Sequence, residues 1–421
     1  DIRLIRGGSV SKGRLGTDTF TDVFSKIVGT KRSNDWIDAS SGSTANLDID
    51  LSTGKLKINN IPGLGKIDAK VSAFEHIAGS QNADKLVGDS RNNILQGNGG
   101  NDTIDGGAGN DTISGGAGSN LLYGSSGNDR YSFTGRNDTL DYSKLSDAIK
   151  LQGFSSSGAS KVDKNSLGSD QFTGSFKAIR ATSSSKDWID ATGNIGIVAD
   201  LQSQSVRAAS SSTNLQIRDF DNVKGSDAAD SIRGDGANNE IIANGGNDVL
   251  RASGGNDTYT FGAGSDSIDY SALSGGIRFI RGGSVSKNNG NGGTDTFTDF
   301  IETIKAGSSS NDWIDGSGGK TANFNVDLSL NRLTLNNIPS VGSKTISIQG
   351  FDHIKGTETA DTIKGDSNAN SLSGNGGDDI IISAGGADII DGGSGNDTIS
   401  VTKAEGAQIT FGAGRDTFAF T

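Results

Sequence analysis

Apolar residues recur at every ninth position through three long stretches of this chain. From Gly79 to Asp141 the sequence divides without a gap into seven nonapeptides, among them GNGGNDTID and GGAGNDTIS, each with an apolar residue at its eighth place. The seventh to ninth places mostly alternate between polar and apolar residues, which predicts a short strand with one buried face. The same register runs through residues 225–269 and 356–400, and it resumes at FGAGRDTFA after a slip of one residue. A fixed short period of this kind predicts a solenoid.

A larger repetition lies over the short one. The segment IRLIRGGSVSK at residues 2–12 returns as IRFIRGGSVSK at 277–287, and the motif WID occurs three times. Segments between the nonapeptide runs, such as ANLDIDLS and ANFNVDLS, alternate in a way that predicts longer strands. We therefore expect an all-β fold, a parallel β-roll (β-solenoid) with strand-rich excursions between the runs of turns. Its three tandem units are predicted at residues 1–140, 141–268 and 269–421.

Aspartate and glycine dominate the composition. The chain has 64 glycines among 421 residues, only 2 prolines, and 50 acidic residues, of which 5 are glutamate and 45 aspartate. Aspartate favours turns over helices, so this composition indicates turns rich in carboxylate. The formal net charge of −12 argues against a nucleic-acid or anionic-membrane partner, because both bind basic patches. There is no cysteine for a disulfide framework, and no apolar run is long enough for a transmembrane segment.

The nonapeptide GGAGNDTIS resembles the G-G-x-G-x-D-x-(apolar)-x repeat of RTX proteins, the family of hemolysin-type calcium-binding nonapeptide repeats. The likeness is specific, because it is repeated without gaps and occurs in all three predicted units. The segments between the runs, including NDWIDAS and NNIP, further resemble large cyanobacterial cell-surface proteins of the S-layer type. The resemblance implies an extracellular protein that leaves the cell by type I secretion and binds multiple Ca²⁺ ions.

The turn residues also suit calcium for physical reasons. Glycine permits positive φ, so backbone carbonyls can approach a common point without a Cβ clash. Aspartate adds a short, hard oxygen ligand, and Ca²⁺ takes roughly six to eight oxygens in irregular geometry. The alternative is ordinary β-turn chemistry without a metal. Because carboxylates stacked at strand spacing would repel one another without a cation, we expect calcium to be part of the fold and the calcium-free chain to be largely disordered.

The resemblance implies that ligands to one ion come from turns two nonapeptides apart. This pairs Asp84 with Asp102, Asp111 with Asp129, Asp230 with Asp248, Asp248 with Asp266, Asp361 with Asp379, and Asp379 with Asp397. In four turns asparagine replaces the sixth-place aspartate, so sites that use it should be weaker or completed by water: Asn93, Asn120, Asn239 and Asn370. The candidate metal ligands are Asp18, Asp84, Asp102, Asp111, Asp129, Asp138, Asp230, Asp248, Asp257, Asp266, Asp295, Asp361, Asp379, Asp388, Asp397 and Asp416.

No set of residues points to catalysis. His76 and His353 occupy the same place in their repeats, where the second unit has Asn222, and this favours a hydrogen-bonding residue at a strand end over a catalytic base. Motifs of zinc proteases, nucleophile elbows and phosphate-binding loops are absent from the sequence. We therefore expect no enzymatic activity. A tryptophan also recurs at a fixed place, either as a structural plug or as a sugar-stacking surface: Trp36, Trp188 and Trp313.

These features predict a structural protein of an extracellular surface layer, sheath, fibril or giant adhesin. The chain begins and ends in apolar strands whose phases in the repeat nearly join, so we expect uncapped ends and self-association into a fibre or lattice. Cell-surface polysaccharide is the other candidate partner. The alternative function is an accessory calcium-binding β-roll module of a secreted RTX enzyme (epimerase, protease or lipase) or toxin. Ice binding is disfavoured, because the variable places lack a regular Thr and Asn face.

Overall fold

The computed structural model describes residues 3–5, 9–12, 17–19, 25–30, 34–63, 65–135, 137–155, 158–281, 283–288, 292–402 and 406–420. Side chains are described at residues 11–12 and, within these ranges, from residue 25 onward. The chain forms two compact units: unit 1 comprises residues 1–195 and 203–222, and unit 2 comprises residues 196–202 and 223–421. These two structural units differ from the three tandem repeats that the sequence predicts. The boundaries of the three repeats stay a prediction.

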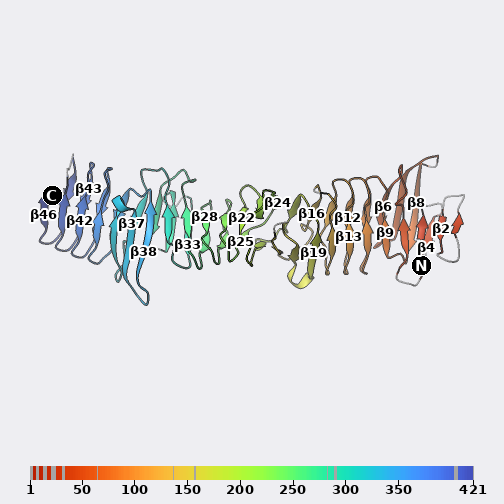
Figure 1. The fold of residues 1–421 in the computed structure, drawn as a ribbon, viewed down its shortest axis with the longest axis horizontal. Helices are drawn as coiled ribbons and strands as arrows, with labels where there is room; N and C mark the ends of the chain where they lie inside the picture. Colours follow the sequence, from red (N-terminus) through yellow and green to blue (C-terminus); the bar gives the residue numbers. More distant parts are fainter. Residues whose placement is uncertain are drawn as a thin grey trace. The chain divides into compact units, whose positions relative to one another are not determined.

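Each unit is a parallel β-roll, as the sequence predicts. A nonapeptide contributes a six-residue turn and a short strand, and successive strands alternate between two sheets, a first sheet and a second sheet. In the second sheet of unit 1, Leu86 of β10 (Lys85–Val87) pairs in parallel register with Ile104 of β12 (Thr103–Asp105). Neighbouring strands are thus two nonapeptides apart in sequence, and they stack side by side along each unit (Figure 1).

Unit 1 has the following strands. The first sheet contains β1 (Arg3–Ile5), β2 (Ser9–Ser11), β3 (Thr17–Thr19), β5 (Trp36–Asp38), β9 (His76–Ala78), β11 (Ile94–Gln96), β13 (Thr112–Ser114), β15 (Arg130–Ser132), β17 (Lys150–Gln152), β18 (Lys161–Asp163), β19 (Ser169–Thr173) and β21 (Trp188–Asp190). The second sheet contains β4 (Lys26–Val28), β6 (Asn46–Asp50), β7 (Lys55–Ile61), β8 (Gly65–Ser72), β10, β12, β14 (Leu121–Tyr123), β16 (Thr139–Asp141), β20 (Ala178–Arg180), β23 (Ser205–Ala208) and β24 (Leu215–Arg218). A short 3₁₀ helix, η2, spans Asn165–Leu167.

Unit 2 is built in the same way. The first sheet contains β25 (Asn222–Lys224), β27 (Glu240–Ile242), β29 (Thr258–Thr260), β31 (Ile277–Ile280), β32 (Ser284–Lys287), β33 (Thr294–Phe297), β35 (Trp313–Asp315), β39 (His353–Lys355), β41 (Ser371–Ser373), β43 (Ile389–Asp391) and β45 (Gln408–Thr410). The second sheet contains β22 (Ile197–Asp200), β26 (Ser231–Arg233), β28 (Val249–Arg251), β30 (Ser267–Asp269), β34 (Thr303–Lys305), β36 (Asn323–Asp327), β37 (Arg332–Ile338), β38 (Gly342–Gln349), β40 (Thr362–Lys364), β42 (Ile380–Ser383), β44 (Thr398–Val401) and β46 (Thr417–Phe420). A 3₁₀ helix, η4, spans Leu328–Leu330.

The core of each roll is a stack of eighth-place side chains. Full burial of one such side chain stabilises the fold by about 1.5–3 kcal/mol, so the stack is the main apolar contribution to stability. The residues that are at most 1% exposed at this place are Leu86, Leu95, Ile104, Ile113, Leu122, Tyr131, Leu140, Ile232, Ile241, Leu250, Tyr259, Ile268, Ile363, Leu372, Ile381, Ile390 and Ile399.

The excursions between the turn runs are antiparallel insertions. Strand β7 pairs antiparallel with both β6 and β8, whereas β6 continues the parallel ladder to β10 and β8 continues it to β4. Leu47 and Ile49 of β6 are buried, as the alternating pattern predicts, and Leu51 lies in the turn beyond the strand. The strand triples β17–β18–β19, β31–β32–β33 and β36–β37–β38 are arranged similarly. An excursion therefore lengthens one coil without interrupting the stack.

Candidate calcium sites

Successive turns on one side of a roll are joined through their sixth-place residues. The backbone N–H of Asp111 donates a 2.9 Å hydrogen bond to Oδ1 of Asp129, which lies 18 residues further along the chain. One carboxylate oxygen of the later residue is thereby used to hold the preceding turn. The structure makes this bond in all six pairs that the sequence analysis proposed: Asp84–Asp102, Asp111–Asp129, Asp230–Asp248, Asp248–Asp266, Asp361–Asp379 and Asp379–Asp397.

The other carboxylate oxygen, Oδ2, is buried and unpartnered in many of these turns. Native proteins leave few buried polar atoms unpaired, because a lost hydrogen bond to water is costly. Among the described residues, no donor reaches Oδ2 of Asp102, Asp111, Asp138, Asp248, Asp266, Asp312, Asp379 or Asp397. Most of the unpartnered oxygens therefore belong to turns that lead into the second sheet. The aspartates that directly precede a strand of that sheet are Asp102, Asp138, Asp248, Asp266, Asp379 and Asp397.

Burial raises the pKa of the unpartnered carboxyls. The pKa of Asp111 and that of Asp379 rise to about 8, and the pKa of Asp102 and that of Asp248 rise to about 7. Desolvation is the largest cause in each case, and the negative charge of neighbouring aspartates adds to it. A cation beside Oδ2 opposes both causes, because it favours the charged carboxylate. These groups have the electrostatics of cation ligands.

Glycines allow the backbone to pass close to the unpartnered oxygens and to neighbouring carbonyl oxygens. A Cβ added to Gly97, the first residue of its nonapeptide, would lie 2.2 Å from Oδ2 of Asp102 and 2.4 Å from the carbonyl oxygen of Gly115. Gly118 has a φ of +122°, and a Cβ there would lie 1.8 Å from the carbonyl oxygen of Gly100. Only glycine fits at these places. The oxygens that gather around them, from carboxylates and carbonyls, are the ligand types that Ca²⁺ prefers.

Comparison with known proteins identifies these turns. The family model described as the RTX calcium-binding nonapeptide repeat matches residues 79–113, 105–140, 219–250, 233–268, 348–381 and 364–399. The matched stretches are RTX calcium-binding repeats. Multiple Ca²⁺ ions are therefore the cofactor of the chain, and the buried Oδ2 atoms together with the turn carbonyls fit that role. The chain is thus a calcium-binding repeat protein.

The other comparisons add little to this assignment. Among solved structures, the extracellular lipase LipA from Serratia marcescens matches with 18% identity over 59% of this chain and 38% of that chain, with a TM-score of 0.20. The chain therefore spans well under two thirds of the length of that lipase. No curated protein matches the chain. Within the described residues, no helix has the length and apolar character needed to cross a membrane.

Some RTX turns satisfy their aspartate from within the chain. Ser80 donates to Asp84 twice, through its N–H to Oδ2 at 2.5 Å and through its hydroxyl to Oδ1 at 3.0 Å. A serine or threonine early in the nonapeptide is a signal visible in the sequence, but it is not sufficient. The hydroxyl of Thr134 donates to the carbonyl of Gly116, and Oδ2 of Asp138 stays unpartnered among the described residues. The same closure by a hydroxyl joins Ser226 to Asp230, Thr357 to Asp361 and Ser383 to Asp388.

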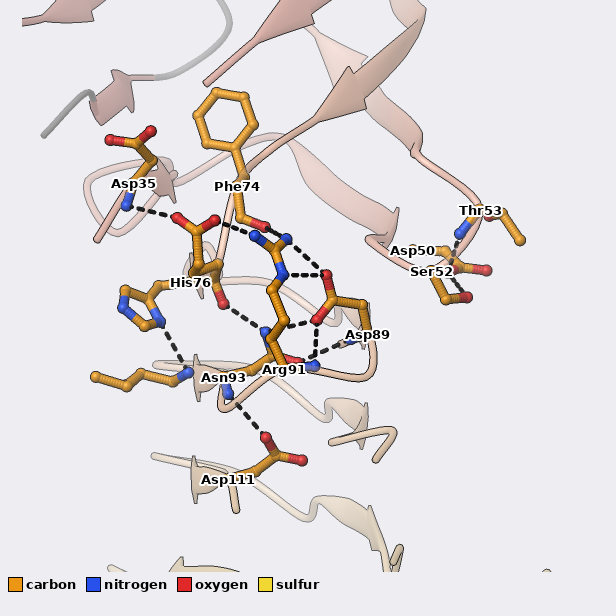
Figure 2. Close-up of polar contacts among 12 residues, drawn as sticks. Asp35, Asp50, Ser52, Thr53, Phe74, His76, Asp89, Arg91, Asn93 and Asp111 are labelled. Carbon is orange, nitrogen blue, oxygen red and sulfur yellow. Dashed lines mark hydrogen bonds and ion pairs between the residues drawn. The ribbon is translucent and has the colours of Figure 1, made fainter. Parts of the chain in front are cut away.

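Asparagine closes its RTX turns through its own amide. Oδ1 of Asn93 accepts a 2.8 Å hydrogen bond from the N–H of Asp89, and Nδ2 of Asn93 donates over 2.7 Å to the carbonyl of Glu75. The guanidinium of Arg91 bonds to Asp89 and Glu75 beside it, and the N–H of Asn93 still donates to Asp111 (Figure 2). This turn has its hydrogen bonds and a positive charge without a metal. The bond to the second-place residue recurs between Asn239 and Asp235 and between Asn370 and Asp366.

The recurrent histidine and tryptophan lie together on neighbouring strands. Nδ1 of His76 accepts a 3.0 Å hydrogen bond from the N–H of Ile94, and burial lowers the pKa of His76 (Figure 2). The rings of Trp36 and His76 lie 4.9 Å apart, and those of Trp313 and His353 lie 4.7 Å apart. Nδ1 of His76 is thus occupied by a backbone hydrogen bond. The histidine and the tryptophan therefore help to stack neighbouring coils.

The remaining predicted ligands have different surroundings. Asp18 lies in β3, but its side chain is outside the described residues. Oδ1 of Asp416 accepts from the N–H of Asp397 at 3.0 Å. Asp312 is not among the ligands predicted from the sequence, although its NDWID motif fits the nonapeptide frame. Oδ1 of Asp312 accepts a 2.6 Å hydrogen bond from the N–H of Ile277. In the described part of the chain, no three His, Cys, Asp or Glu side chains converge as a metal cluster. Buried lysines contact Asp129, Asp257 and Asp295.

Proposed function

We propose that this chain is a calcium-stabilised structural segment of an extracellular surface layer, sheath, fibril or giant adhesin. The supporting observation is the recurrence of buried, unpartnered Oδ2 atoms through both units, as at Asp102, Asp248 and Asp379. A cation at each place joins two coils by turning carboxylate repulsion into attraction. Because each coil contacts only its neighbours, this device extends over any number of repeats. Rigidity then depends on the calcium concentration around the protein.

Secretion is part of this proposal. RTX repeats are typical of secreted proteins, and a chain that needs calcium to fold can remain unfolded in calcium-poor cytosol until it leaves by type I secretion. Outside the cell, calcium then drives folding in place. We also propose that the chain has no catalytic activity of its own. A catalytic site needs one unique, shaped constellation, whereas the carboxylates here repeat with the coils.

Self-association is the partner that this function requires, with cell-surface polysaccharide as the second candidate. Electron microscopy of the purified chain with and without calcium tests it. The expected result is fibres or sheets that form in calcium and disperse in a chelator. A monodisperse monomer in calcium would contradict the structural role and favour the alternative, an accessory calcium module of a secreted enzyme or toxin.

A further inference from the structure

Among the described residues, two lysines are buried in the turns of the rolls. Lys164 is 0% exposed and Lys287 is 2% exposed, although lysine is among the residues least often buried. Lys164 directly follows β18, and Lys287 is the last residue of β32. Both strands are the middle strands of antiparallel excursions. Each excursion therefore brings its lysine against a turn that lies more than 30 residues earlier in the sequence.

Each ammonium group contacts the same three kinds of oxygen. Nζ of Lys164 donates to the carbonyl of Ser125 at 2.5 Å, to Oδ2 of Asp129 at 3.2 Å, and to Oδ1 of Asp170. In unit 2, Nζ of Lys287 makes the equivalent bonds to a second-place carbonyl, a sixth-place carboxylate and the carboxylate of the next turn. The partners and distances are the carbonyl of Ser253 at 2.9 Å, Oδ2 of Asp257 at 3.4 Å and Oδ1 of Asp295 at 2.5 Å.

The ammonium takes the oxygen that is left unpartnered in other RTX turns. Oδ2 of Asp111 has no donor among the described residues, whereas Oδ2 of Asp129, in the next turn on the same side, receives Nζ of Lys164 and the hydroxyl of Ser125. The hydroxyl of Tyr142 donates a 2.7 Å hydrogen bond to Oδ2 of Asp170, the carboxylate of the next turn. In unit 2, Ser253 and Tyr270 donate in the same way to Asp257 and Asp295. The carboxylate pair is then satisfied by protein groups alone.

We propose that Lys164 and Lys287 are internal cations that replace Ca²⁺, so that these two turn pairs bind no calcium and hold the roll together when calcium is scarce. A buried ammonium is costly unless its three donors are all used, and here each has an oxygen partner. Removing such a lysine leaves two buried carboxylates facing each other. That arrangement matches the calcium-binding turns.

Both lysines lie where the step between stacked turns is longer than the regular one. A regular step between stacked turns is 18 residues, as from Asp111 to Asp129. The step is 41 residues from Asp129 to Asp170 and 38 residues from Asp257 to Asp295, because the excursions are inserted there. The sequence repetition places Lys12 where unit 2 has Lys287. This inference concerns calcium stoichiometry alone and stands or falls independently of the surface-layer proposal.

The direct test is to remove each lysine and count bound calcium. Lys164→Ala and Lys287→Ala are expected to gain one Ca²⁺ each, measured by elemental analysis after desalting and by calorimetric titration. Terbium should show tyrosine-excited emission at the new site of Lys164→Ala, because the hydroxyl of Tyr142 bonds to Asp170 there. The matched control is Lys144→Ala, which breaks a half-exposed 2.6 Å ion pair with Asp105 and should leave the stoichiometry unchanged. Unchanged stoichiometry in both lysine variants of the turns would overturn the proposal.

Hydrogen exchange of the unaltered chain tests the same idea if the variants do not fold. As free calcium is lowered, the strands around the lysines, β15 with β19 and β29 with β33, should lose protection after β12 and β28. Loss in the opposite order, or all together, would contradict the proposal.

Intact mass provides a further check: the mass should equal that of the sequence. A mass lower by one water per lysine would show an amide bond between Nζ and the carboxyl carbon of Asp170 or Asp295, and would overturn the assignment of a free ammonium.

Discussion

The backbone N–H of Asp379 donates a 2.9 Å hydrogen bond to Oδ1 of Asp397, while Oδ2 of Asp397 has no donor among the described residues. One oxygen of this carboxylate holds the preceding turn, and the other is available to a cation. The same aspartate therefore serves the backbone and the metal. Folding and calcium binding in these repeats are coupled at the level of a single side chain.

Calcium removal should unfold most of the chain. The unpartnered carboxylates repel one another when charged, and the chain has no disulfide to hold it. We expect a chelator at neutral pH to abolish most of the β signal in circular dichroism, and excess Ca²⁺ to restore it. A chelated chain that keeps both its β signal and its melting temperature would show that calcium is not part of the fold.

Aspartates with a free Oδ2 should matter more for calcium than those closed by a hydroxyl. Asp379→Ala is expected to lower the number of bound ions, whereas Asp361→Ala should change it less, because Thr357 donates to both oxygens of Asp361. Asp379→Ala also leaves the N–H of Asp361 without its acceptor, and Asp361→Ala leaves those of Phe324 and Thr357. Each such loss costs about 1–3 kcal/mol. Calorimetric titration separates the two effects. Equal losses of calcium in the two variants would be evidence against the distinction.

The calcium-free chain should be more stable in mild acid than at neutral pH. The folded-state pKa of Asp111 and Asp379 is about 8, above the ordinary value of 3.8, so the folded state binds more protons than the unfolded state. Their contribution to stability is full below 3.8 and is lost as the pH rises through about 8. Calcium affinity should rise over the same range. Circular dichroism of calcium-stripped protein from mildly acidic to mildly basic pH measures this. Increasing β content with rising pH would contradict it.

The eighth-place side chains should carry the apolar stability. Ile381 is 0% exposed, whereas its neighbour Ile380 is 46% exposed. Ile381→Ala should lower the free energy of unfolding in excess calcium by about 2–5 kcal/mol, because it leaves a cavity in the stack. Ile380→Ala, the matched control, should change it by only about 0.5 kcal/mol or less. Urea denaturation of the two variants compares them, and similar losses would mean that the strand faces are wrongly assigned.

Glycine at the fourth place should be irreplaceable. In Gly118→Ala the new Cβ would lie 1.8 Å from the carbonyl oxygen of Gly100, at a φ of +122°. We expect a loss of at least about 1 kcal/mol in the free energy of unfolding, together with weaker calcium binding. The control is Gly236→Ala, where no atom lies within 4 Å of the added Cβ. A neutral Gly118→Ala variant would indicate that the turn carbonyls can move without affecting the site.

The sequence by itself determined the β-roll and its repeating positions. Turn and strand are formed within nine residues, so glycine, the sixth-place aspartate and the eighth-place apolar residue are all local signals. The placement of Ile104 and Ile113 in the core follows from this register, as does the stacking of Asp111 on Asp129. The type of metal also follows, because carboxylates and carbonyls are ligands for Ca²⁺.

Only the tertiary structure decided which aspartates are free for a cation. Asp84 and Asp102 have the same place in the repeat, yet Ser80 donates to Asp84 and no described residue donates to Oδ2 of Asp102. Asp129 receives its cation from Lys164, which lies 35 residues away and directly follows the inserted strand β18. A period in the sequence fixes what is local to each nonapeptide. It does not fix where an excursion of variable length returns to the stack. In this protein two excursions bring the buried ammonium groups of Lys164 and Lys287 to the carboxylates.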